Sequence, residues 1–245
     1  MSTIPTGDSV RATEALLVTA TDGQERLAEA ARYAVLQRIA PVLRHDVAGF
    51  MQPVGMLMMM LQRRVQMPEP DLQVIAKNVA SANALTKEAT VGCMKAIDWI
   101  SNRENTNVSL RSSINEGAAL LSMELSSQGL EISNIISDDA AAVPQSFFRS
   151  VLVGALLAFC DQRTAGRILE ISLETDAEND AAVNRVMLRM RPGDAPEVPG
   201  LTGLLGMDRA ARRIDWSDVE AMAGSFRVSI VRGDGWLAVA LPKCS

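Results

Sequence analysis

The chain has 245 residues, of which 48% are hydrophobic and 22% charged, and its formal net charge is -5. This length and apolar content suffice for one large or two small folded domains. The acidic balance argues against a general nucleic-acid binder, which normally presents a strongly basic face.

Cysteine usage and apolar runs indicate where the protein resides. Cys93, Cys160 and Cys244 form neither a C-x-x-C pair nor an even set, which favours a reducing compartment and indicates no metal site. No apolar run reaches the ~20 residues that a membrane-crossing helix needs, and the N-terminus carries no basic-then-apolar leader. We therefore expect a cytoplasmic protein with no membrane contact.

The first part of the chain predicts a long helix after a flexible N-terminus, residues 1–21. Asp22 followed by Glu25 is typical of a helix start. Beyond it, apolar residues recur at alternating steps of three and four, a spacing typical of a coiled-coil seam. The seam residues are Leu36, Ile39, Leu43, Val47, Phe50, Val54, Leu57, Leu61 and Val65.

A second seam follows Met67–Pro70, a proline-containing break. It keeps the same spacing and is dominated by small residues in its middle, which favours close helix packing. Its members are Leu72, Ile75, Val79, Ala82, Thr86, Ala89, Cys93, Ala96 and Ile100. The short turn predicts an antiparallel helical hairpin over residues 22–103. Such a hairpin cannot bury its seam alone, so we expect a homodimer that forms a four-helix bundle.

Residues 108–245 predict a second domain of mixed α/β structure, beyond the polar linker Asn102–Asn107. Periodicity favours helices over 110–128, over 145–160 and from 207, and strands over 130–136, 167–174 and 183–191. Asp234-Gly235 between the apolar segments 226–232 and 236–241 predicts a terminal β-hairpin.

His45, the only histidine, lies on the first long helix and is followed by Asp46. At ~100° per residue it falls opposite the seam, alongside Arg38 and Gln52, so its imidazole should face solvent. A neutral imidazole is a competent nucleophile near neutral pH, and Asp46 could orient it and stabilise a phosphorylated form. A solvated surface histidine is the alternative interpretation.

Charge and strain around His45 favour a functional role. Residues 30–66 contain five arginines and one acid, Asp46, and such a helix would attract an acidic surface or a phosphoryl group. Pro41 and Pro53, two residues that strain a helix, bracket the histidine. A merely solvated basic face is the alternative here.

This layout resembles the sensor histidine kinases over residues 32–243. The resemblance implies a hairpin that dimerises, with His45 as phosphoacceptor and Asp46 as its acidic neighbour. The family's polar residue four places on is here Gly49, and its proline five places on is Phe50.

The second domain resembles the ATP-binding domain of that family. Residues 147–161 follow its asparagine-box helix and residues 166–172 the next strand, which implies an ATPase-like α/β sandwich. Gly154 and Ala158 stand where the family has magnesium-binding asparagines. The first glycine box falls at 190–194 without its Asp-x-Gly-x-Gly pattern. Only traces of the later glycine elements remain, at 203–206 and 223–224. We therefore expect no tightly bound cofactor, and ATP binding is doubtful.

A histidine retained beside a degenerate nucleotide site is similar to dimeric histidine phosphotransferases of bacterial phosphorelays. By that resemblance, His45 would exchange phosphate with aspartates of response-regulator receiver domains, and the receiver would supply magnesium. Arg38, Arg44 and Gln52 are expected to contact the receiver. Two alternatives stay open: a pseudokinase adaptor that carries no phosphate, and a divergent ATP-dependent histidine kinase.

Overall fold

The structure, a computed structural model, describes residues 7–101, 106–138, 141–162, 167–176, 183–193 and 212–242, and excludes the side chains of 7–21, 176 and 183. It divides into two compact units. One comprises Ile39–Arg103, and the other combines the chain up to Arg38 with Glu104–Ser245. The first is called the hairpin unit below and the second the α/β unit.

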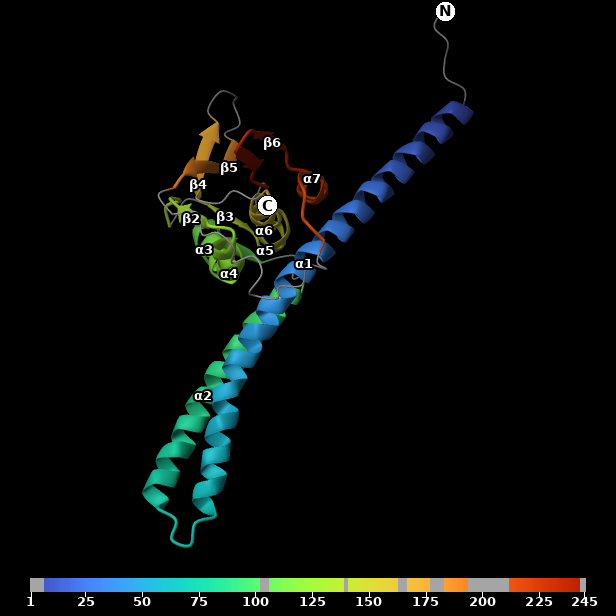
Figure 1. The fold of residues 1–245 in the computed structure, drawn as a ribbon. Coiled ribbons are helices and arrows are strands. Elements are labelled where there is room, and N and C mark those ends of the chain that lie inside the picture. The colour runs from blue at the N-terminus through green and yellow to red at the C-terminus, as the bar shows by residue number, and fades with distance from the viewer. Residues whose placement is uncertain are drawn as a thin grey trace, which may run out of the picture. The chain divides into compact units, whose positions relative to one another are not determined.

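The hairpin unit contains the end of helix α1 (Gly7–Val65) and helix α2 (Leu72–Ile100), which run side by side (Figure 1). The break between them lies where the sequence predicts it. Asp71 caps α2, because its side chain accepts hydrogen bonds from the backbone N–H groups of Gln73 (2.9 Å) and Val74 (3.1 Å). The predicted helical hairpin is confirmed.

Small residues set the close approach of the two hairpin helices. Ala82, Ala89 and Ala96 of the second seam are buried. A side-chain carbon added at Gly92 would lie 2.3 Å from the ring of Phe50, so the ring fills the space that glycine leaves. Other residues of the two seams are not covered within one chain. Val65, Leu72, Val79 and Ile100 remain exposed.

Helix α1 begins at Gly7 and not at the predicted Asp22. The segment Ala12–Leu17 contains alanine, glutamate and leucine, residues of high helix propensity, so the helix can extend past a local capping signal. Asp22 does not cap the helix. It forms an ion pair one turn on with Arg26, at 2.9 Å.

Among the described residues, no helix is both long and apolar enough to cross a membrane.

The α/β unit is a two-layer sandwich, and its helices lie on one face of a sheet (Figure 1). The helices are α3 (Leu110–Leu120), α4 (Ser122–Ser127), α5 (Gln145–Phe147), the π-helical turn η1 (Phe148–Leu152), α6 (Val153–Asp161) and α7 (Trp216–Ser225). The strands are β1 (Asn107–Ser109), β2 (Leu130–Asn134), β3 (Ala142–Pro144), β4 (Arg167–Asp176), β5 (Val183–Pro192), β6 (Ile230–Gly233) and β7 (Trp236–Ala240). The predicted fold class, a long helical hairpin followed by an α/β sandwich, is confirmed.

The main sheet has the order β2-β4-β5-β7-β6, with β2 and β4 parallel and the other neighbours antiparallel. Along β4, Leu169 and Ile171 are buried under the helices, whereas Glu170 pairs on the other face with Arg191 of β5 at 2.7 Å. This alternation follows from the two-residue period of a strand. Strands β1 and β3 form a separate two-stranded sheet that the sequence pattern did not predict.

The core of this unit is the apolar stretch predicted as one helix over 145–160. It forms three consecutive helical turns or helices, α5, η1 and α6, and every residue from 150 to 160 is buried. Phe147 meets Phe226 edge to face at 5.5 Å between ring centroids, and Phe159 meets Trp216 at 5.0 Å. Such aromatic pairs add to the stabilisation that burial provides.

Two predictions near the C-terminus have different outcomes. The terminal β-hairpin is confirmed, because Gly233 of β6 pairs with Trp236 of β7 across a two-residue turn. Gly235 there has φ +71°, a conformation that glycine adopts without strain. The helix expected from Met207 begins outside the described residues, and α7 starts at Trp216.

Helix α1 also contributes to the α/β unit, which the sequence pattern did not predict. Ala28, Ala31, Ala34 and Val35 form a second buried stripe on the helix, distinct from the seam. Arg32 lies 5.6 Å from the centroid of the Phe226 ring and donates a hydrogen bond to Ser225 at the end of α7. The helical layer of the α/β unit thus includes the part of α1 that ends at Arg38.

Candidate functional site

His45 lies on α1 in the hairpin unit, and its side chain is 76% exposed. Its Nδ1 atom lies 3.5 Å from Oδ1 of Asp46, whose side chain is 47% exposed. The position of His45 opposite the seam predicts that its side chain faces solvent, and the structure agrees. The ring is therefore accessible from solvent.

The contact with Asp46 has a chemical consequence. A carboxylate beside Nδ1 favours the neutral tautomer that carries its proton there, which leaves the lone pair on Nε2. The Nε2 atom is then the nucleophile. A positive charge that develops on the ring would be stabilised by the Asp46 carboxylate.

The three predicted partner-binding residues lie in different surroundings. Arg44 and Gln52 are exposed on the hairpin unit. Arg38 is not, because its side chain is only 12% exposed. The expectation that Arg38 faces solvent beside His45 is therefore wrong.

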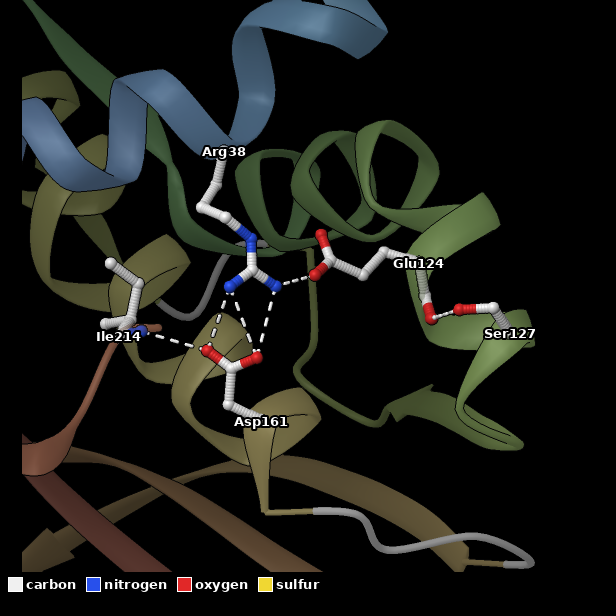
Figure 2. A network of polar contacts seen from close by, with 5 residues as sticks. All are labelled: Arg38, Glu124, Ser127, Asp161 and Ile214. Carbon is white, nitrogen blue, oxygen red and sulfur yellow. Dashed lines mark hydrogen bonds and ion pairs between the residues drawn. The ribbon is translucent and has the colours of Figure 1, made fainter. Parts of the chain in front are cut away.

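Arg38 instead binds two carboxylates of the α/β unit (Figure 2). Its Nη1 atom lies 3.0 Å from Oδ2 and 3.2 Å from Oδ1 of Asp161 at the end of α6, and its Nη2 atom donates to Glu124 of α4. Asp161 also accepts a hydrogen bond from the backbone N–H of Ile214 at 2.9 Å. Arg38, Asp161 and Glu124 are called the Arg38 clasp below. The carboxylates lie 123 and 86 residues from Arg38, so no local pattern could reveal them.

The positions that correspond to the family's magnesium-binding asparagines lie in the core. Gly154 and Ala158 of α6 are both buried. A side-chain carbon added at Gly154 would lie 2.5 Å from Cε of Met222 and 3.6 Å from Cγ2 of Val35. The glycine-box positions 194 and 203–206 lie outside the described residues. Within the described part of the chain, no three His, Cys, Asp or Glu side chains gather as a metal site would require.

The hairpin unit carries an exposed apolar surface. Five methionines of α1 are exposed along it: Met51, Met56, Met58, Met59 and Met60. Near the turn, residues of both helices line an open groove of about 530 Å³, among them Met58, Leu61, Ile75 and Val79. Methionine side chains are flexible and polarisable, so they suit adaptable contacts with a partner.

Cys160 is expected to resist alkylation in the native protein. Burial, and secondly the adjacent Asp161 carboxylate, raise the pKa of its thiol to about 12, and only the thiolate reacts. Cys93 on α2 is only half-buried. After iodoacetamide treatment at pH 8, peptide mapping should find Cys93 modified and Cys160 unmodified until the chain is unfolded. Equal rates at the two residues would contradict the packing of α6.

Comparisons with known proteins find likeness only among solved structures. No family model matches the chain, and no curated protein matches its sequence. The catalytic domain of histidine kinase ThkA in a nucleotide-free form is 16% identical, with 56% of this chain and 95% of that chain covered and a TM-score of 0.38. Histidine kinase AdeS of Acinetobacter baumannii is 15% identical, with 77% and 96% covered and a TM-score of 0.37. ThkA in complex with response regulator protein TrrA is 13% identical, with 91% and 66% covered and a TM-score of 0.39.

Proposed function

We propose that the chain is a histidine phosphotransferase, which relays phosphoryl groups between response-regulator receiver aspartates through His45. The observation that carries the proposal is an exposed histidine, the only one in the chain, whose Nδ1 lies 3.5 Å from an adjacent carboxylate. Such a transfer needs an accessible nucleophile whose orientation is set by a neighbouring group, here the Asp46 carboxylate.

The bonds formed and broken in this transfer balance, and no reactant other than the receiver is needed. Nε2 of His45 attacks the phosphorus of a receiver phosphoaspartate in line, the N–P bond forms, and the P–O bond to the aspartate breaks. The receiver carboxylate leaves with the electron pair. The ring keeps its Nδ1 proton and becomes an imidazolium, which the Asp46 carboxylate stabilises. Magnesium, which the receiver brings, neutralises charge on the transferred group.

The partner surface that we propose is an acidic receiver face. Arg44 and Gln52 are exposed on the hairpin unit and are the proposed contacts. We do not retain Arg38 in this role, because two carboxylates of the α/β unit already bind its guanidinium. Basic side chains around the nucleophile would also steer an acidic partner toward it.

We also propose a homodimer. The exposed seam residues Val65, Leu72, Val79 and Ile100 leave an apolar strip along the hairpin unit. Pairing two such strips in a four-helix bundle would remove them from water, and ~25 cal/mol per Å² of buried apolar surface favours that association.

Packing at Gly154 supports a phosphotransferase over a divergent histidine kinase. Met222 and Val35 occupy the space around this position, where the resemblance would require a magnesium-binding side chain. The adaptor alternative is favoured by a different observation, the exposed methionines of α1, which would suit a partner that binds without chemistry.

The experiment that tests the proposal follows radioactive phosphate onto the purified chain from two donors, a phosphorylated receiver and ATP. Phosphohistidine is labile in acid and stable in base, whereas phosphoaspartate is labile in base. Because the chain has a single histidine, acid-labile and base-stable label that is lost in His45→Gln identifies His45. We expect such label from the receiver and none from ATP. Label from ATP would establish a kinase, and a chain that binds receivers but takes no label would establish the adaptor.

A further inference from the structure

Helix α1 runs without interruption through Pro41, although proline opposes helix at that point. Pro41 has no N–H group for the carbonyl of Gln37, and its ring clashes with that carbonyl. The residue before a proline, here Ala40, also avoids helical backbone angles. The helix is therefore intrinsically weakened between Gln37 and Pro41. At the start of a helix, in contrast, proline is favoured.

The stretch before this weak point has little apolar surface to hold it. Three of its four fully packed side chains are alanines, and only Val35 offers more than a methyl group. The free energy of hydrophobic burial scales with the apolar area buried, so the alanine-rich face of α1 gains little from packing on the α/β unit for its length. The stretch also makes polar contacts, those of Arg32 to Ser225 and of Arg38 to its clasp.

The Arg38 clasp lies directly beside the weak point. Arg38 is one residue past Gln37 and three before Pro41, and it is the last residue of α1 that belongs to the α/β unit. Asp161 is fixed by the N–H of Ile214 as well as by Arg38 (Figure 2). Oε2 of Glu124 is buried and has no hydrogen-bond partner among the described residues. The single positive charge of Arg38 pairs with both shielded carboxylates.

We propose that the Arg38 clasp is a latch that keeps α1 continuous across Pro41. While the latch is closed, the α/β unit holds the helix on the N-terminal side of the proline. When it opens, the helix breaks there, and Pro41 becomes the first residue of a shorter helix that carries His45. The latch is a conformational device that operates whether or not His45 accepts phosphate.

The test is native-state hydrogen exchange on the full chain with Arg38→Met. We expect the amides of residues 28–40 to exchange at least about tenfold faster, with no change in residues 43–61 or in β4 and β5. Arg44→Met is the matched control, because it removes an exposed arginine from the same helix, and it should change nothing. Unchanged exchange in residues 28–40 of Arg38→Met would overturn the proposal.

A second variant separates the latch from simple destabilisation. Adding Pro41→Ala to Arg38→Met should restore much of the lost protection, because alanine supports the helix without help from the clasp. A purely structural loss of contact would not be rescued in this way. If Arg38→Met unfolds the sheet, Glu124→Ala provides the same comparison, since it removes one of the two carboxylates that hold the guanidinium.

Discussion

The variant His45→Gln is expected to accept no phosphate from a phosphorylated receiver while it folds as the wild type does. Glutamine keeps a polar side chain but has no nucleophilic ring nitrogen. The histidine side chain is 76% exposed, and substitutions at such positions usually change stability by less than about 0.5 kcal/mol. Transfer of radioactive phosphate and the thermal unfolding midpoint are measured on the same preparation.

A matched variant isolates the contribution of the carboxylate. Asp46→Asn keeps the size of the side chain and removes its charge, so the imidazolium of the phosphorylated state loses its partner at 3.5 Å. We expect slower transfer, with some label retained. Base-stable label on His45→Gln at the wild-type level would refute the assignment of His45. Equal rates for Asp46→Asn and wild type would remove Asp46 from the mechanism.

The second large effect is expected at Gly154, where Gly154→Asn inserts the residue type that the histidine-kinase resemblance calls for. The Cβ atom of the new side chain would lie 2.5 Å from Cε of Met222 and 3.6 Å from Cγ2 of Val35. The amide group beyond Cβ would need further space. Overpacking costs about 1–3 kcal/mol, and a buried amide without partners costs about as much again. At ~2–4 °C per kcal/mol, the unfolding midpoint should fall by roughly 5–20 °C.

The same variant tests the nucleotide side of the proposal. Because Cε of Met222 and Cγ2 of Val35 lie beside this position, Gly154→Asn should gain no saturable binding of a fluorescent ATP analogue. Gly224→Asn on α7 is the control, since a side chain there would meet nothing within 4 Å, and its midpoint should stay near that of wild type. Tight nucleotide binding by Gly154→Asn at unchanged stability would contradict the packing.

The hairpin could be predicted from the sequence because its signals are local. The seam repeats every three or four residues, and the prolines of the turn end α1 as expected. The apolar run that forms α5 to α6 was also predictable, because its length and hydrophobicity leave only a core position. In both cases residues that are close in sequence determine the local structure, and contacts between distant residues are consistent with it.

The missed features depend on distant contacts or on weak side-chain signals. The second buried stripe of α1 consists largely of alanines, which are equally at home on an exposed helix face. Arg38 lies seven residues before His45, and the helical period predicts the same solvent-facing side for both, but Asp161 and Glu124 bind its guanidinium. Strands β1 and β3 have three residues each, too few for a period of two to be recognised.

The position of β7 has a consequence for synthesis of the protein. This strand, Trp236–Ala240, lies inside the sheet between β5 and β6, although it is the last strand in chain order among the described residues. On the ribosome, β5 therefore has an open edge until residues 236–240 have emerged. Both hairpin helices are complete by Ile100, and their contacts with each other join residues near in sequence, which form early. During translation, the hairpin that carries His45 should thus form before the sheet, which is incomplete until its interior strand β7 has been synthesised.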